Sequence, residues 1–370
     1  MRANLQLPRL QLHEGAIQTL PLELQFHGVA KPLVMSDKGV AKCGIVDAVL
    51  KFAPAGTVVF DNVTESPVFA DCDAAMAAYV KGGCDSIVAV GGGSVIDAAK
   101  LTAVIAGHGG CAADFAGYSE RVTRSVVPLI VIPTTAGTGS ECSPGAGVHP
   151  DGKSLEAPLG GPFIIPKSAI CDPALTMSLP PSLTAATGID ALTHCVEGYL
   201  AVPPSPLIDV LALDGIRRLC ANIEAAVKNG GDRTARLEMM TGAFVSGVAI
   251  QKGLGPAHAI ANSCGDQGIH HGKLSAIGLL ASLKFLETRE PEKLASIHQA
   301  MKLPNGVTVE DGLRDLMERL NLPTTLRGAG YQAPPVAMLA QSCVRSHFNR
   351  TCPHKPTEAE YSKMISDILG

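Results

Sequence analysis

The segment Gly188–Glu197, which reads GIDALTHCVE, places a carboxylate and an imidazole four residues apart. The segment is expected to be helical, and residues at i and i+4 lie on one face of a helix. Asp190 and His194 can therefore hold one divalent metal ion between them. A metal bound by a carboxylate and histidines usually acts as a Lewis acid, because structural zinc sites rely on cysteine.

Further imidazoles that could complete this site follow at His258, His270 and His271. His258 lies in Gly253–Asn262, whose small residues predict a buried helix. A single histidine on an apolar helix is often an ordinary core residue, so it is the whole set that indicates a metal. Aspartate and histidine suit Fe(II) and Zn(II) alike, and an open coordination position would receive a substrate oxygen.

A glycine-rich turn, GGGS, joins an expected buried strand to an expected helix. Gly92 and Gly93 lack Cβ atoms, so the backbone there can approach phosphate oxygens closely. Ser94 opens a helix whose free N–H groups and dipole favour an anion. The pattern predicts a nucleotide-binding loop, although a tight turn without a ligand fits the same residues.

A second polar loop, PTTAGTGSE, follows the next expected strand. The hydroxyls of Thr134, Thr135 and Thr138 can bond to pyrophosphate, ribose or a carboxamide, and two such loops together favour a dinucleotide pocket. Asp37 follows the first expected strand, where a carboxylate can bind an adenosine ribose and would repel the extra phosphate of NADP. NAD is therefore the expected cofactor. The alternative is that Asp37 is an ordinary solvated residue at the start of a helix.

Composition narrows the class of protein further. The chain has 370 residues, a length that suits two domains, and 46% of them are hydrophobic. Net charge is −4, and the sequence shows neither a basic stripe nor an apolar run of membrane-spanning length, so we expect neither a nucleic-acid nor a membrane partner. The eleven cysteines are scattered without a CxxC pair, which is typical of reduced thiols in the cytoplasm.

The order of expected elements predicts the fold class. Continuous apolar runs near residues 33–36, 57–60, 86–90 and 128–132 alternate with helical stretches, which predicts a Rossmann-like parallel sheet covered on both faces. From about Pro180 onward the spacing is helical. We therefore expect a dinucleotide-binding α/β domain over residues 1–179 and an all-α, metal-binding and catalytic domain over residues 180–370.

The chain resembles the iron-dependent (group III) alcohol dehydrogenases. The motifs that carry the likeness are GGGSVIDAAK, PTTAGTGSE, CDPALTMSLPPSLTAATGIDALTHCVEGYL and the histidine segment 253–272, with weaker likeness in HEGAIQTL and CPHKPTEAEYSKMI. The likeness spans nearly the whole chain, and the long central motif is highly specific. It implies a dehydroquinate synthase-like architecture, NAD(H)-linked interconversion of small alcohols and aldehydes, and a homodimer or larger homo-oligomer.

The resemblance also implies roles for individual residues. The four metal ligands would be Asp190, His194, His258 and His271. The cofactor contacts would be Gly92, Gly93, Ser94, Thr134, Thr135 and Thr138, with Asp37 as the ribose-binding carboxylate.

Three departures from the family pattern qualify these expectations. Asn262 stands where relatives often carry a histidine that is a candidate proton relay, the stretch from His258 to His271 is one residue short, and Ser66 stands where an asparagine is common. With Asn262 unable to titrate, His270 becomes the candidate catalytic proton carrier, and water with the nicotinamide ribose is the alternative carrier. His270 as an exposed neighbour of a ligand is the other interpretation of that residue. A zinc polyol (glycerol-type) dehydrogenase and a catalytically silent NAD- or metal-binding homologue are the alternative functions.

Overall fold

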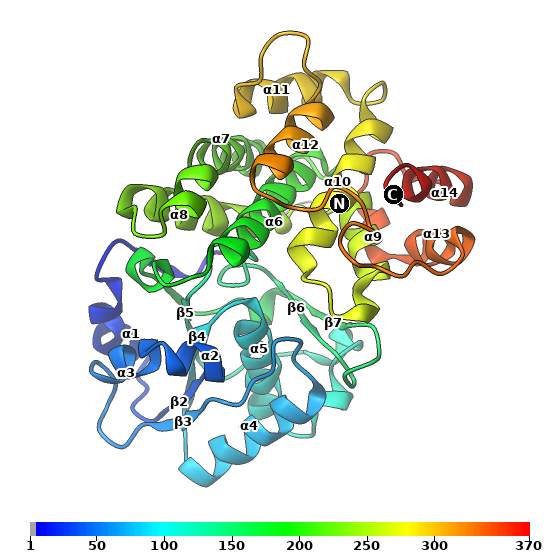
Figure 1. The fold of residues 1–370 in the computed structure, drawn as a ribbon. Helices are drawn as coiled ribbons and strands as arrows, with labels where there is room; N and C mark the ends of the chain where they lie inside the picture. Colours follow the sequence, from blue (N-terminus) through cyan, green and yellow to red (C-terminus); the bar gives the residue numbers. More distant parts are fainter. Residues whose placement is uncertain (1–4) are drawn as a thin grey trace. The chain divides into compact units, whose positions relative to one another are not determined.

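The computed structural model describes residues 5–370 (Figure 1). These residues form two compact units. One unit comprises residues 6–135 and 140–179. The other comprises residues 136–139 and 180–370, together with Leu5. We propose that the α/β domain ends at residue 179 and that the all-α domain begins at residue 180.

The first unit is built on a parallel sheet. Within the described residues it has six strands in the order β1-β8-β5-β4-β2-β3. Their bounds are β1 Arg9–Leu12, β2 Pro32–Met35, β3 Val58–Phe60, β4 Ser86–Gly91, β5 Leu129–Pro133 and β8 Ser168–Cys171. The inner strands β2, β4, β5 and β8 are buried along their whole length, because helices cover both faces of the sheet.

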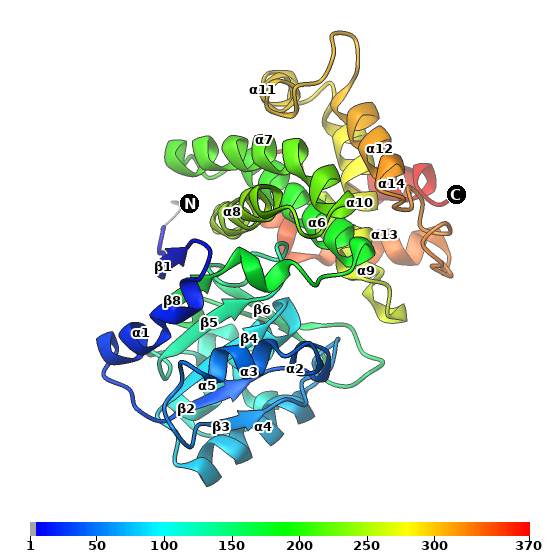
Figure 2. The same cartoon turned by 60° about the vertical axis from the view of Figure 1, so that its left-hand side comes forward.

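Successive side chains of each strand point to opposite faces of the sheet. Val34, Val88 and Ile130 lie in one core cluster with residues of α1 (Leu20–Phe26) and α3 (Ile45–Leu50). The helices α4 (Phe69–Gly82) and α5 (Gly93–His108) pack together against the strands from the other side, as right-handed crossovers require (Figure 2). A short antiparallel pair, β6 (Gly145–Val148) and β7 (Ala157–Gly160), completes this unit.

The second unit is helical. The buried helix α6 (Pro181–Leu200) packs against α7 (Pro206–Lys228), α8 (Arg233–Ile250) and α10 (His271–Leu286). The short α9 (Pro256–Ser263) packs against α10. The remaining helices are α11 Pro291–Met301, α12 Val309–Arg319, α13 Val336–Arg345 and α14 Glu358–Asp367. The predicted fold class, a Rossmann-like α/β unit followed by an all-α unit, is confirmed.

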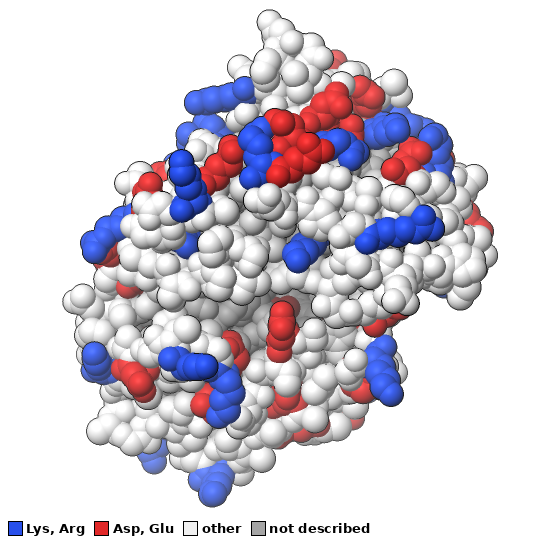
Figure 3. Space-filling view, viewed as in Figure 1, with Lys and Arg blue, Asp and Glu red and all other residues white. Residues whose placement is uncertain are grey.

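The surface charge, the helix lengths and the cysteines can be compared with the expectations from composition. On the face drawn in Figure 3, Lys and Arg side chains are interspersed with Asp and Glu and do not form a continuous basic stripe. Across residues 5–370, every helix is too short or too polar to cross a membrane. No disulfide bond joins the eleven cysteines, all of which fall in this range.

Candidate metal centre and nucleotide-binding loops

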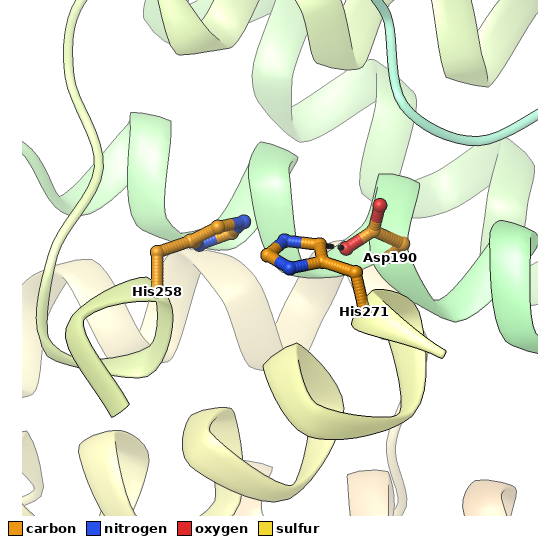
Figure 4. A group of neighbouring side chains, drawn as sticks. All are labelled: Asp190, His258 and His271. Atoms are coloured by element: carbon orange, nitrogen blue, oxygen red, sulfur yellow. Dashed lines mark ion pairs between the residues drawn. The ribbon is translucent and has the colours of Figure 1, made fainter. Parts of the chain in front are cut away.

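Three of the four predicted metal ligands converge in the helical unit. One ligand atom each from Asp190 on α6, His258 on α9 and His271 at the start of α10 all lie within 4.8 Å of one another (Figure 4). Oδ1 of Asp190 is 4.0 Å from Nε2 of His271. Asp190 and His258 are buried, whereas the His271 side chain is 42% exposed. This arrangement leaves one ligand reachable from solvent and two held within the protein.

The close packing of α10 on α6 brings His271 to Asp190. Gly272, which follows His271, lies so near α6 that a Cβ atom there would sit 2.1 Å from the carbonyl oxygen of Ala186. The same atom would lie 3.0 Å from Cβ of Asp190. The absence of a side chain at Gly272 is therefore what allows the first turn of α10 to reach the carboxylate.

His194 lies beside this group but outside it. Its ring stacks on that of His258, with 4.7 Å between centroids and 20° between planes, yet its nitrogens do not join the cluster of ligand atoms within 4.8 Å. Burial lowers the pKa of His194 to about 3 against the opposing charge of Asp190. The ring is therefore a neutral imidazole near neutral pH, which is the form that binds a metal.

The buried donor atoms fit a metal ion. Nδ1 of His194 and Nε2 of His258 are both buried and have no hydrogen-bond partner among the described residues. Buried polar atoms without partners are unfavourable, and unpartnered imidazole nitrogens on two stacked rings are donors that a divalent transition metal would satisfy. Burial by itself would raise the pKa of Asp190, but the surrounding imidazoles and a hydrogen bond outweigh it and lower the value to about 2. The site thus offers an anionic oxygen beside neutral nitrogens.

Two supporting residues were missed in the sequence. Ser275 donates a hydrogen bond of 2.7 Å to Oδ1 of Asp190, and the carboxylate of Glu197 lies 2.7 Å from Nδ1 of His258. Helical spacing could have placed both on ligand-bearing helix faces, because Ser275 follows His271 by four residues and Glu197 follows His194 by three, but it could not have given the partner of Glu197. A charged residue in an otherwise apolar helix such as α6 is itself a signal of a specific partner.

His270 is the N-cap residue that precedes α10, and it does not belong to the cluster of ligand atoms. Its Nδ1 accepts a hydrogen bond of 3.1 Å from the backbone N–H of Gly272, so the side chain caps the helix. Asn262 lies one turn after His258 on α9 and is partly buried. The capping bond gives His270 a structural role alongside the catalytic role proposed for it.

The predicted nucleotide loops lie at the carboxyl ends of neighbouring strands. Gly92 precedes α5, and a Cβ atom there would lie 3.3 Å from Cγ2 of Thr135, so the two loops are in contact distance. The N–H of Thr134 donates a bond of 3.0 Å to the carbonyl of Gly91. The hydroxyl of Ser94 donates to the carbonyl of Glu65 at 2.5 Å. Thr138, by contrast, belongs to the stretch 136–139 that groups with the helical unit.

Asp37 also lies at this edge, two residues after the end of β2. Its Oδ1 accepts a hydrogen bond of 2.9 Å from the N–H of Val40 and caps α2 (Lys38–Lys42). This is the helix-entry role that the sequence left open as an alternative. One carboxylate oxygen remains for another partner, so the cap and a ribose contact are compatible.

Comparisons with known proteins agree along the whole chain. The family described as iron-containing alcohol dehydrogenase matches residues 8–173, and the C-terminal region of the Fe-containing alcohol dehydrogenase family matches residues 184–369. A 4-hydroxybutyrate dehydrogenase of Cupriavidus necator is 38% identical, covering 98% of this chain and 98% of its own. Long-chain-alcohol dehydrogenase 1 of Geobacillus thermodenitrificans is 34% identical, covering 90% of this chain and 87% of its own.

Solved structures show the same likeness. A 1,3-propanediol oxidoreductase superimposes with a TM-score of 0.93 at 27% identity, covering 100% of both chains. An iron-containing alcohol dehydrogenase of Thermotoga maritima superimposes with a TM-score of 0.86 at 26% identity, covering 99% of both chains.

Proposed function

Because this chain belongs to the iron-containing alcohol dehydrogenase family and is an alcohol dehydrogenase, we propose that it interconverts a small alcohol and its aldehyde with NAD(H) and a divalent metal. The family predicted from the sequence motifs is thereby confirmed. The observation that carries the metal proposal is the convergence of Asp190, His258 and His271 within 4.8 Å beside buried imidazole nitrogens without partners.

The proposed ligands are Asp190, His194, His258 and His271, and the proposed metal is Fe(II), with Zn(II) as the alternative. When bound, the metal supplies Lewis-acid stabilisation of negative charge on the substrate oxygen, and NAD supplies the hydride acceptor. The residues present the charge that this chemistry needs. Asp190 gives one negative charge, and the neutral ring of His194 adds none, so these two ligands do not fully neutralise a divalent ion.

The proposed NAD contacts combine a helix N-terminus with hydroxyl groups. Free N–H groups at the start of α5, beside Gly92, Gly93 and Ser94, would bind the pyrophosphate. Thr134 and Thr135 would add hydrogen bonds from the neighbouring loop, and Thr138 from the stretch that follows. Asp37 would accept bonds from the adenosine ribose with its second oxygen.

We propose His270 as the group that passes the substrate proton to solvent, since Asn262 cannot titrate. We also propose a cytoplasmic location and a homodimer or larger homo-oligomer. Within the described residues β1 and β3 are the edge strands of the sheet, and such edges present backbone groups that can pair with a second chain.

A metal reconstitution assay tests the function. Chelator-treated protein is reloaded with Fe(II) or Zn(II) without oxygen, and NAD reduction is followed with 4-hydroxybutyrate, 1,3-propanediol and 1-butanol. 4-Hydroxybutyrate and 1,3-propanediol are suggested by the relatives' names, and 1-butanol matches 4-hydroxybutyrate without its carboxylate. We expect activity that is lost with the chelator and restored by metal. No turnover of any alcohol or aldehyde by metal-loaded protein would contradict the proposal.

A further inference from the structure

Glu197 is a buried carboxylate with three hydrogen-bond donors around it. It lies on α6, where the residue is 2% exposed. Its Oε1 accepts from the backbone N–H of Ala257 at 2.8 Å. Its Oε2 accepts from the backbone N–H of His258 at 3.3 Å and is 2.7 Å from Nδ1 of the same histidine. Both oxygens are therefore engaged by the first turn of α9.

This arrangement assigns the tautomer of His258. A carboxylate can only accept hydrogen bonds, so the proton of the contact must reside on Nδ1 of His258. In the neutral ring the lone pair then resides on Nε2. That atom is buried and has no hydrogen-bond partner among residues 5–370. The structure thus leaves the metal-binding lone pair on the nitrogen directed away from Glu197.

The surroundings of Glu197 are shaped for this carboxylate. A Cβ atom at Gly255 would lie 2.9 Å from Oε1 of Glu197, so a side chain at that position would crowd the oxygen. The negative charge also lies at the N-terminus of α9, where the free N–H groups of a helix favour an anion. The same contacts that cap α9 therefore set the position of His258 on it.

We propose that Glu197 is a positioning residue for the metal site, which fixes the tautomer and the ring orientation of His258 through Nδ1. The inference rests on the proposed function in that it takes His258 as a metal ligand. Carboxylates that orient ligating histidines in this way commonly change metal affinity by about 10–100-fold when they are removed.

Glu197→Gln is the informative variant, because an amide has one accepting oxygen instead of two. If that oxygen accepts from Nδ1 of His258, the NH₂ group faces the N–H of Ala257. If it accepts from Ala257, the NH₂ group faces Nδ1 and favours the opposite tautomer, which places a proton on Nε2. Each arrangement either sets two donors against each other or places the ring proton on the metal-binding nitrogen. We therefore expect Zn(II) affinity to fall by about 10–100-fold, measured in competition with a chromophoric chelator.

Glu23→Gln is the matched control. Glu23 is 1% exposed and accepts hydrogen bonds from Arg9, Gln11 and Ser168, but it lies in the sheet unit. It therefore reports the effect of losing a buried carboxylate without touching the site, and its Zn(II) affinity should equal that of the wild type. A folded Glu197→Gln variant with wild-type Zn(II) affinity overturns the proposal.

A second measurement needs no substitution at Glu197. In wild-type, metal-free protein labelled with ¹⁵N-histidine, the His258 signals, assigned by their loss in His258→Gln, should show a protonated Nδ1 and an unprotonated Nε2. The opposite tautomer overturns the proposal even if Glu197→Gln fails to fold. Because the measurement uses neither substrate nor NAD, its outcome is separate from that of the alcohol oxidation assay, which tests the function.

Discussion

The hydroxyl of Ser275 on α10 donates a hydrogen bond of 2.7 Å to Oδ1 of Asp190 on α6. Both residues are buried, and the same oxygen lies 4.0 Å from Nε2 of His271. The bond therefore restrains the carboxylate where the proposed ligands meet.

Ser275→Ala should weaken metal binding without unfolding the protein. A hydrogen bond to a charged group contributes about 1.5–3 kcal/mol, which corresponds to roughly a 10–100-fold loss of affinity if the bond is needed to orient Asp190. Chelator competition with Zn(II) measures the loss. Ser282→Ala is the control, because Ser282 is buried on the same helix and its hydroxyl has no hydrogen-bond partner among the described residues. Equal affinities in the two variants would contradict the prediction.

Asp37→Asn should relax the preference for NAD over NADP. Asparagine keeps an oxygen that can accept from Val40 and cap α2, while the charge that would repel the extra phosphate is removed. We expect kcat/KM for NADP(H) to rise by roughly tenfold, in line with about 1–2 kcal/mol for one screened charge pair. Asp47→Asn removes the same charge from an exposed position on α3 and should leave the cofactor ratio unchanged. An unchanged ratio in Asp37→Asn would remove this residue from the cofactor site.

His270→Asn tests the proton relay while keeping the helix cap. The asparagine oxygen can replace Nδ1 as the acceptor for the Gly272 N–H, but the side chain cannot titrate. If His270 carries the substrate proton, one limb of the pH–rate profile of kcat/KM should flatten. A profile that coincides with the wild type at every pH would leave His270 with its capping role alone.

Glu141→Gln should change how stability depends on pH. Burial raises the pKa of Glu141 to about 7, partly offset by its own backbone N–H and by Lys100. The folded protein therefore retains a proton that the unfolded chain has lost, so stability falls as pH rises from about 4.5 to about 7, by up to about 3 kcal/mol. The glutamine variant should lack this decline in urea denaturation. A parallel decline in both proteins would contradict the assignment to Glu141.

Gly272→Ala should separate α10 from α6. The added Cβ would lie 2.1 Å from the carbonyl oxygen of Ala186, so the helices must move apart, and we expect a destabilisation of about 1–3 kcal/mol. Metal affinity should fall with it, since His271 is the preceding residue. Gly265→Ala is the control, because a Cβ there meets no atom within 4 Å. A Gly272→Ala variant with wild-type stability and affinity would show that the contact can relax.

Part of the site could be predicted from spacing and part could not. The face shared by Asp190 and His194 follows from helical geometry, yet it is Asp190 that lies within 4.8 Å of His258 and His271. The spacing fixes the face of a helix but not the rotamer, and the His194 ring instead stacks on His258. The pairing of Glu197 with His258 depends on how α9 packs, which no local pattern contains.

The fold, too, could be predicted from the sequence only in part. The continuous apolar runs of the inner strands predicted β2, β4 and β5 to within a residue or two. The helical stretch expected between the first two strands is instead two short helices, α2 and α3, because Gly44 adopts a left-handed φ of 75° between them. The strand β1 gave no signal, since RLQL alternates weakly and its partner β8 is remote in the chain.

The pairing of β1 with β8 has a consequence for synthesis on the ribosome. Among the strands of residues 5–370, β1 is translated first, but β8, the strand that pairs with it, is translated last. At ordinary elongation rates the first strand waits roughly 10–30 s before its partner exists. β1 therefore stays without its strand partner during most of the synthesis of the α/β unit. A chaperone that binds extended segments can bind β1 during that interval.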